Sequence, residues 1–187
     1  MMHPDDVLHR LAAGPLLRLS DLPDDAVGLY ALADHDHGLR YVGMTRAPAE
    51  SFRRRIYQRH RTGSETHSHM FSRMYCTGRM WRDRVLQRGH PDGNLAKRLR
   101  NAFVAEHCRA AVVPVDPHVQ SIPLLEREVL RRAPPAMVAW NGQATGALLE
   151  PVALVDGMIA ALGLDAAERA VLDRQAALQG RHASIHA

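Results

Sequence analysis

The sequence predicts an α/β fold in which a small, mostly antiparallel β-sheet is flanked by helices, with a helical insertion and further helices at the carboxy terminus. Two short apolar stretches at 28–32 and 41–43 flank a polar turn that ends in glycine, a pattern typical of a β-hairpin. The valine-rich run at 110–115 predicts a third strand, and Pro114 favours an edge or terminal position for it. Apolar residues spaced three and four apart predict helices around these strands.

The hairpin is the first predicted element with functional interest. We expect Tyr30 to lie opposite Tyr41, a register that also sets the two glycines of the strands against each other. Because strand side chains alternate between faces, both tyrosines then share a face with Gly28 and Gly43. This face would carry two phenols beside a gap that another backbone, a helix or a phosphate can approach. On spacing alone, an aromatic pair in an ordinary hairpin is favoured over a functional motif.

Helix start and stop signals place the elements on either side of the hairpin. A short helix is predicted over 5–13, because the Gly14-Pro15 pair stops it. After the hairpin, Pro48 is expected to open a second helix as its first-turn residue. This helix would run to about Arg61 and end at Gly63.

The middle and the end of the chain are also predicted to be largely helical. Residues 64–92 have mixed spacings, so their assignment stays open between short helices and a twisted strand. Asn94 is expected to cap an amphipathic helix, and Pro123 to open another that reaches about Arg132. Three segments complete the prediction: a short extended piece at 137–142 and two helices at about 148–162 and 165–178.

Composition limits the cellular setting. With 187 residues the chain forms one domain, or one domain with an appended helical piece. No apolar run reaches membrane-spanning length and the amino terminus lacks the features of a signal peptide, so we expect a cytoplasmic protein without a membrane partner. Cys76 and Cys108 have no metal-ligand spacing, which favours two reduced thiols.

Basic residues are concentrated in the middle of the chain. Residues 40–109 hold 16 Arg or Lys against five Asp or Glu, whereas the rest of the chain holds eight against 15. A basic middle between acidic flanks is typical of a surface that faces a polyanion such as nucleic acid. Arginine outnumbers lysine 23 to one, which favours a GC-rich genome as the cause, so only the clustering supports the inference.

Five elements, in order along the chain, resemble the GIY-YIG nuclease superfamily. The resemblance begins with Gly28-Leu29-Tyr30 and Tyr41-Val42-Gly43, with ten residues between the two tyrosines. The other three elements are Arg55 in a helix that follows Met44-Thr45, Glu126 in a Leu-Glu-x-x-aliphatic-aliphatic helix, and Asn141 after Trp140. The match covers 27–62 and 110–141. It implies a nuclease domain over 27–141 with a basic insertion at about 63–109, an amino-terminal lead over 1–26 and a helical appendage over 142–187.

The resemblance implies a metal-dependent endonuclease that hydrolyses phosphodiester bonds in DNA. Glu126 would bind Mg²⁺ or Mn²⁺, since a carboxylate supplies hard oxygen ligands. Arg55 would hold the scissile phosphate. Tyr30 or Tyr41 would accept a proton from the attacking water, which requires a nearby cation because a free phenol has a pKa of about 10. Asn141 would orient a phosphate or the metal-bearing loop.

Two positions in this set have alternatives. The family often places a histidine four residues after the helix arginine, but Arg59 stands at that position here and His60 follows it. Either Arg59 takes the place, or His60 reaches in from further around the helix, or a neighbouring arginine sets the register; we favour Arg55 with His60. Glu126 fits the pattern better than Glu128, which cannot share its helix face.

A restriction-type enzyme that cuts duplex DNA at specific sequences fits a stand-alone chain with a large basic insertion. It would act as a homodimer, with the apolar carboxy-terminal helices as interface material. The alternatives are a structure-selective repair or mobile-element nuclease, a nucleic-acid-binding module that does not cut, and a basic adaptor for an acidic protein. The arginines expected to contact DNA are Arg53, Arg54, Arg59, Arg73, Arg79, Arg82, Arg84, Arg98 and Arg100.

Overall fold

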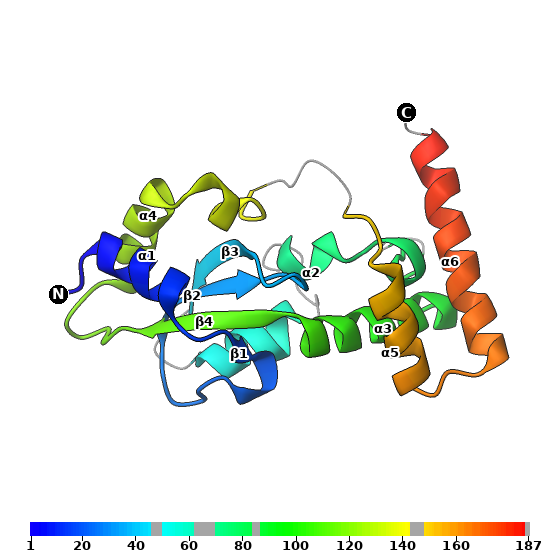
Figure 1. Ribbon diagram of the computed structural model, residues 1–187, viewed down its shortest axis with the longest axis horizontal. Coiled ribbons are helices and arrows are strands. Elements are labelled where there is room, and N and C mark those ends of the chain that lie inside the picture. Colours follow the sequence, from blue (N-terminus) through cyan, green and yellow to red (C-terminus); the bar gives the residue numbers. More distant parts are fainter. Residues whose placement is uncertain (46–49, 62–69, 84–86, 143–147, 186–187) are drawn as a thin grey trace. The chain divides into compact units, whose positions relative to one another are not determined.

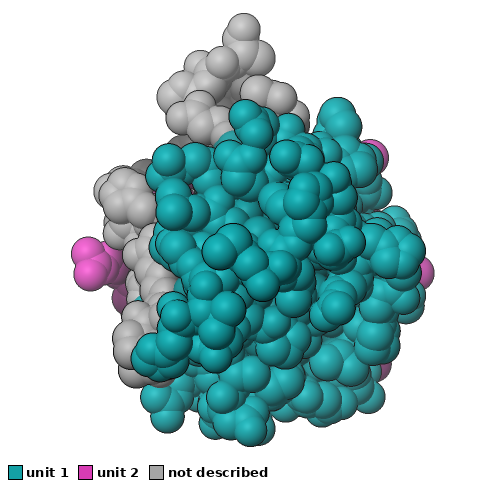
Figure 2. Space-filling model, turned by 90° about the vertical axis from the view of Figure 1, so that its left-hand side faces the viewer, with its two compact units in different colours: residues 1–71, 105–144 teal, residues 72–104, 145–187 magenta. Residues whose placement is uncertain are grey.

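The computed structural model describes residues 1–45, 50–61, 70–83, 87–142 and 148–185, drawn as the coloured ribbon in Figure 1. The chain divides into two compact units, coloured separately in Figure 2: residues 1–71 with 105–144, and residues 72–104 with 145–187. The predicted amino-terminal lead therefore belongs to the unit that holds the sheet. Most of the predicted insertion joins the carboxy-terminal helices in the second unit.

The first unit is built on a four-stranded antiparallel sheet with the strand order β1-β4-β2-β3 (Figure 1). The strands are β1 (Leu17–Arg18), β2 (Gly28–Ala33), β3 (Leu39–Met44) and β4 (Arg109–Pro114). The predicted α/β class is confirmed, and the short strand β1 is an addition. β4 lies between β1 and β2, so Pro114 occupies a terminal position within an inner strand, where its missing N–H costs no ladder bond.

The hairpin is present, but its predicted register is wrong by two residues. Tyr30 pairs with Gly43, and Leu32 pairs with Tyr41. The turn occupies residues 34–38, between the paired residues Ala33 and Leu39. A register irregularity between Leu32 and Ala33 changes the pairing of the strands beyond this turn.

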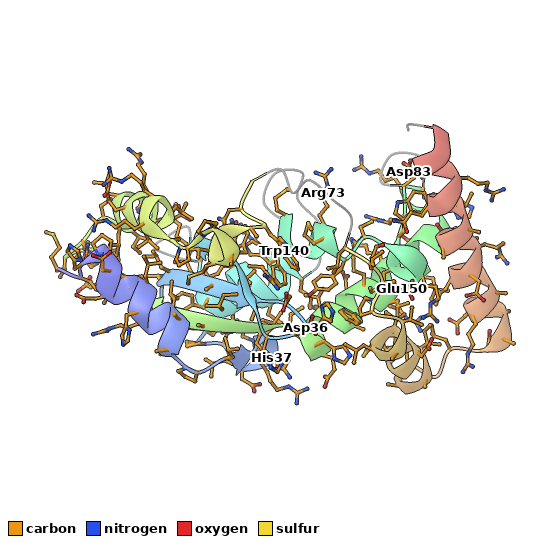
Figure 3. All side chains as sticks on the ribbon, turned by 45° about the horizontal axis from the view of Figure 1, so that its top comes forward. Asp36, His37, Arg73, Asp83, Trp140 and Glu150 are labelled. Atoms are coloured by element: carbon orange, nitrogen blue, oxygen red, sulfur yellow. The ribbon has the colours of Figure 1, made fainter. Side chains whose placement is uncertain are left out.

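The carboxylate of Asp34 stabilises this five-residue turn. It accepts hydrogen bonds from the backbone N–H groups of Asp36 (3.0 Å) and Gly38 (2.8 Å) and from Nε of Arg40 (2.7 Å). Asp36 and His37, at the tip of the turn, are labelled in Figure 3. His37 has a φ of 63°, a left-handed conformation that tight turns use.

Two helices cover the apolar face of the sheet. These helices, α1 (Pro4–Ala13) and α4 (Ile122–Arg132), lie side by side in Figure 1 and agree with the predicted segments. Their buried residues join those of alternate strand positions in one core: Val7, Leu11, Leu29, Ala31, Val42, Ala111, Val113, Val115, Ile122, Leu125, Val129 and Met137. Tyr30 and Tyr41 point to the opposite face because strand side chains alternate.

The remaining elements of the chain are mostly short. They are η1 (Leu19–Asp21), η2 (Arg54–His60), α2 (Met70–Met74), η3 (Gly78–Met80), α3 (Pro91–His107), η4 (Pro135–Val138), α5 (Val152–Ala161) and α6 (Ala166–Ile185). η4 is a 3-10 helix, so the predicted extended piece at 137–142 is wrong there. Pro48 and Gly63, the expected limits of the helix after the hairpin, lie outside the described residues.

The second unit is helical. α3 begins at Pro91, three residues before the predicted cap, so Asn94 lies inside the helix. Asp165 caps α6, since its carboxylate accepts from the N–H of Glu168 (2.8 Å), whose carboxylate accepts from the N–H of Asp165 (3.1 Å). Of the proposed interface residues, Ile159 is buried in this unit, whereas Leu149 and Val152 are exposed.

Among the helices that the structure describes, none combines the length and apolarity needed to cross a membrane.

Candidate active site

Tyr30 and Tyr41 lie on the same face of the hairpin, as predicted. The two-residue shift preserves this arrangement because side chains alternate with a period of two residues. The tyrosines are now diagonal neighbours, with ring centroids 6.3 Å apart and ring planes 23° from parallel. Tyr30 is fully buried and Tyr41 is half-buried.

The two motif glycines are needed for different reasons. A Cβ on Gly43 would lie 2.8 Å from the Tyr30 hydroxyl and 2.9 Å from the Tyr41 ring, so the tyrosines fill the gap expected there. Gly28 has a φ of 152°, and a Cβ on it would overlap the carbonyl oxygen of Val113 in β4. The close approach of another backbone, one of the predicted possibilities, therefore occurs at Gly28.

The helix η2 brings Arg55 and His60 to this face. It is a π-helix, in which residue i accepts a hydrogen bond from residue i+5; the same pattern continues in the 3.1 Å bond from Arg61 N–H to the carbonyl of Ile56. This geometry places residues five apart on one side, so Arg55 and His60 are both buried. Arg59, four residues after Arg55, has a side chain that is 46% exposed. Of the alternatives, His60 is the residue that joins Arg55.

His60 is the centre of the aromatic cluster. Its Nε2 lies 2.5 Å from the Tyr30 hydroxyl. The edge of its ring meets both tyrosines, with centroid distances of 5.6 Å to Tyr30 and 5.3 Å to Tyr41. The imidazole is thus held by one hydrogen bond and two aromatic contacts, a geometry suited to exchanging a proton with Tyr30.

Arg55 is a buried cation with unused hydrogen-bonding capacity. It hydrogen-bonds Tyr30, and its Nη1 lies 3.9 Å from Oε2 of Glu50. Its Nε and Nη1 are buried and make no hydrogen bond to any described residue. Burial lowers the pKa of Arg55, but the opposing effects of Tyr30 and Glu50 are larger. The net pKa is therefore raised, and the guanidinium stays charged.

The pKa of Tyr30 lies well above its ordinary value of 10. Burial is the largest cause and the neighbouring Tyr41 adds to it, whereas Arg55 lowers the pKa by charge and by hydrogen bonding. The predicted help from an arginine is present, but burial outweighs it. Tyr30 is therefore a neutral phenol at neutral pH and can donate its proton to Nε2 of His60.

Glu126 is half-buried on α4, and its carboxylate is close enough to Tyr30 to raise the pKa of the phenol. Glu128 instead pairs with Arg131 at 2.5 Å and lines a surface groove with the amino-terminal residues. Of the two glutamates, Glu126 is therefore the one whose charge acts on the Tyr30 phenol. Within the described ranges, no group of three or more His, Cys, Asp or Glu side chains is placed to hold a metal.

The side-chain amide of Asn141 is hydrogen-bonded to the backbone of the neighbouring strand β3. Its Oδ1 accepts from the N–H of Val42 (2.8 Å) and its Nδ2 donates to the carbonyl of Val42 (2.5 Å). The preceding Trp140 donates its N–H to the carbonyl of Arg40 (2.9 Å). Since β3 is an edge strand, these bonds satisfy its outer backbone groups between the two motif residues Tyr41 and Gly43. Both ends of the Asn141 amide therefore bind β3, and the expected role of Asn141 in orienting a phosphate or the metal-bearing loop stays a prediction.

Two buried residues of the site were not predicted from the sequence. Thr45 pairs with Gly28 through its hydroxyl (3.0 Å) and its N–H (2.9 Å), which closes the open end of the hairpin. Glu50 lies beside Arg55 and is only 6% exposed. A signal for Glu50 existed in the sequence, because it is the single acidic residue in a stretch from 40 to 64 that holds seven arginines.

Several arginines predicted to contact DNA are engaged within the protein. Arg100 is buried, and Arg79 forms ion pairs of 2.6 Å with Glu150, labelled in Figure 3, and with Asp156. Arg59 pairs with Glu50 at 2.6 Å. The structure shows Arg79 paired with two carboxylates and Arg100 buried, and the contact of these two arginines with DNA stays a prediction.

Other predicted arginines are accessible. Arg53 is exposed and lies over the ring of Tyr57, 5.9 Å from its centroid, and Arg73 is exposed on α2 (Figure 3). Arg54 and Arg98 are also exposed and lie 3.9 Å from Asp24 and 3.8 Å from Glu168, respectively. Arg82 is half-buried, and Arg84 lies outside the described residues.

Comparison of the chain with protein-family models, with curated proteins and with solved structures finds no match in any of the three. The resemblance to GIY-YIG nucleases stays a prediction that depends on the residues and geometry described above.

Proposed function

We propose that this chain is a metal-dependent endonuclease of the GIY-YIG type that hydrolyses phosphodiester bonds in duplex DNA. The observation that carries the proposal is the cluster of Tyr30, Tyr41, His60 and Arg55, of which all but Tyr41 are buried, together with the charge of Glu126 that acts on Tyr30. The hairpin of β2 and β3 and the helix η2 form this region, and the distant helix α4 carries Glu126. Burying a cation, phenols and a histidine together costs stability, a pattern more typical of a reactive site than of a core.

Arg55 is the phosphate-binding residue in this proposal. Its buried Nε and Nη1, which make no hydrogen bond to a described residue, are donors that phosphate oxygens accept well. Charge-assisted hydrogen bonds of this kind also stabilise the additional negative charge that develops on the phosphorus oxygens in the transition state.

Glu126 would hold Mg²⁺ or Mn²⁺ beside Tyr30. A single carboxylate fits these ions, which retain several waters and take further ligands from substrate phosphates. When bound, the cation supplies Lewis-acid stabilisation of the phosphate and favours ionisation of water.

The proton of the attacking water passes to Tyr30 as Tyr30 passes its own proton to Nε2 of His60. The 2.5 Å separation between the two atoms suits this transfer, and the high pKa of Tyr30 makes a free phenolate the less favourable route. Tyr30 is fully buried, so the substrate must open a path to its hydroxyl. Tyr41 is half-buried and would meet the substrate first.

The test is cleavage of plasmid and phage DNA with Mg²⁺ or Mn²⁺, across about pH 6.5 to 9.5, by the wild type, Glu126→Ala and Glu128→Ala. Discrete fragments that disappear only in Glu126→Ala support a sequence-specific endonuclease, and a homodimer in solution would match two cuts in a palindrome. Cleavage that survives Glu126→Ala would overturn the assigned metal ligand.

The substrates also separate the alternatives. Cleavage confined to branched or nicked DNA would favour a structure-selective repair or mobile-element nuclease. Salt-sensitive binding without cleavage of any substrate would favour a nucleic-acid-binding module.

A further inference from the structure

Glu50 is a buried carboxylate that the catalytic scheme above does not use. Only 6% of the residue is exposed, and it immediately precedes Ser51, whose hydroxyl accepts a hydrogen bond from Arg54 N–H (3.2 Å) at the start of the helix that carries Arg55. Two arginines of that helix surround the carboxylate. Oε1 lies 2.6 Å from Nη1 of Arg59, and Oε2 lies 3.9 Å from Nη1 of Arg55.

The two arginines contact Glu50 in different ways. The Arg59 pair is close, and the side chain of Arg59 is 46% exposed. The Arg55 pair is an ion pair at the limit of direct contact, so it supplies charge without occupying Nε or Nη1 of Arg55 in a hydrogen bond. Glu50 thus compensates the charge of the Arg55 guanidinium, while the N–H donors of Arg55 stay available to another acceptor.

We propose that Glu50 is a positioning residue that holds the Arg55 guanidinium in the orientation that receives the scissile phosphate, and that Arg59 offsets the charge of Glu50 so that the phosphate is not repelled. The inference rests on the proposed role of Arg55 as the phosphate-binding residue.

The charges of the three side chains give the expected effect of each substitution. Glu50, Arg55 and Arg59 together carry one net positive charge. Arg59→Gln reduces it to zero and leaves the Glu50 carboxylate to repel a phosphate bound at Arg55. Glu50→Gln raises the charge to two, which favours binding, but it removes the ion pair that orients Arg55.

The experiment measures kcat and KM for cleavage, and Kd for the same duplex DNA without divalent metal, using the full chain. Arg59→Gln is expected to raise Kd and KM about tenfold with little change in kcat. Glu50→Gln is expected to lower kcat about tenfold or more without raising Kd. The double variant should regain the wild-type Kd and keep the low kcat, whereas Arg59→Lys should keep the wild-type Kd because it keeps the charge.

Two exposed ion pairs of the first unit supply matched controls. Arg131→Gln removes one positive charge from a pair with Glu128, and Glu106→Gln removes one negative charge from a pair with Arg18. Neither control variant is expected to change kcat without KM, or KM without kcat. Thermal unfolding of each variant identifies any loss of folded protein; if Glu50→Gln does not fold, the comparison of Arg59→Gln with Arg59→Lys and Arg131→Gln still decides whether charge compensation governs binding.

The outcomes separate this inference from the endonuclease proposal. If the wild type cuts DNA and Glu50→Gln keeps a normal kcat, the role of Glu50 is wrong and the endonuclease stands. If the wild type binds DNA but cuts no substrate, the endonuclease fails, and the Kd values of Arg59→Gln and the double variant still test the charge balance. If Arg59→Gln and Arg131→Gln weaken binding equally, the specific role of Arg59 is wrong. A wild type that neither binds nor cuts DNA overturns both.

Discussion

Arg55 in the first unit and Arg79 in the second are both largely shielded from solvent, but their surroundings differ. Arg79 donates through Nε to Glu150 and through Nη1 to Asp156, both at 2.6 Å, and through Nη2 to the carbonyl of Val152 at 3.4 Å. Arg55 has one distant ion pair and a hydrogen bond to Tyr30, and its Nε and Nη1 make no hydrogen bond to any residue described by the structure. A satisfied guanidinium stabilises a fold, whereas an unsatisfied one is prepared to bind an anion.

The largest expected effect is on catalysis by the arginine with unused donors. Arg55→Gln should lower kcat for DNA cleavage by a factor of about 10² to 10³, the usual loss when one donor to a developing anion is removed. Cleavage kinetics measure the loss, and denaturant unfolding establishes that the variant is folded. Near-normal cleavage by a folded Arg55→Gln would remove Arg55 from the site.

The opposite result is expected for Arg79. Arg79→Gln should lower the free energy of unfolding by about 2 kcal/mol, because it leaves the mostly buried Glu150 carboxylate without its cation. Denaturant titration measures this loss. Affinity for DNA should stay unchanged, because Arg79 is committed to Glu150 and Asp156; a weaker affinity at unchanged stability would contradict the structural role.

The burial of Tyr30 beside Arg55 makes the stability of the protein depend on pH. Its pKa in the folded protein is raised above 10 by burial, so folding favours the neutral phenol. The resulting stabilisation is fully present below about pH 10 and is lost as the pH rises toward the folded pKa, at up to about 1.4 kcal/mol per pH unit. The free energy of unfolding, measured at intervals from about pH 8 to 11, should fall more steeply with pH for the wild type than for Tyr30→Phe. Equal slopes would show that Tyr30 does not titrate differently in the two states.

The smallest effect is expected for an arginine whose ion pair is exposed. Arg98 lies 3.8 Å from Glu168, and its side chain is 55% exposed. Arg98→Gln should change the free energy of unfolding by less than about 0.5 kcal/mol, because solvent screens such pairs. A loss as large as that of Arg79→Gln would show that accessibility does not separate these arginines.

Local patterns in the sequence predicted much of the site. The shared face of Tyr30 and Tyr41 was predicted correctly even though the register was wrong, because a shift of two residues leaves strand faces unchanged. Glu126 was preferred to Glu128 because residues two apart on a helix point in different directions, and of the two only Glu126 has a charge that acts on the pKa of Tyr30.

Short-range periodicity and turn chemistry were enough to predict the hairpin, the helices α1 and α4 and the face on which the tyrosines lie. The folded chain was needed to show that the π-helix η2 brings His60 to Tyr30, that Asn141 binds the backbone of β3, and that Glu50 is buried beside Arg55. It also showed that the guanidinium of Arg79 has hydrogen-bond partners, whereas Nε and Nη1 of Arg55 make no hydrogen bond to a described residue. Which charged groups are buried, and which partners they find, depends on tertiary contacts that local sequence patterns do not show.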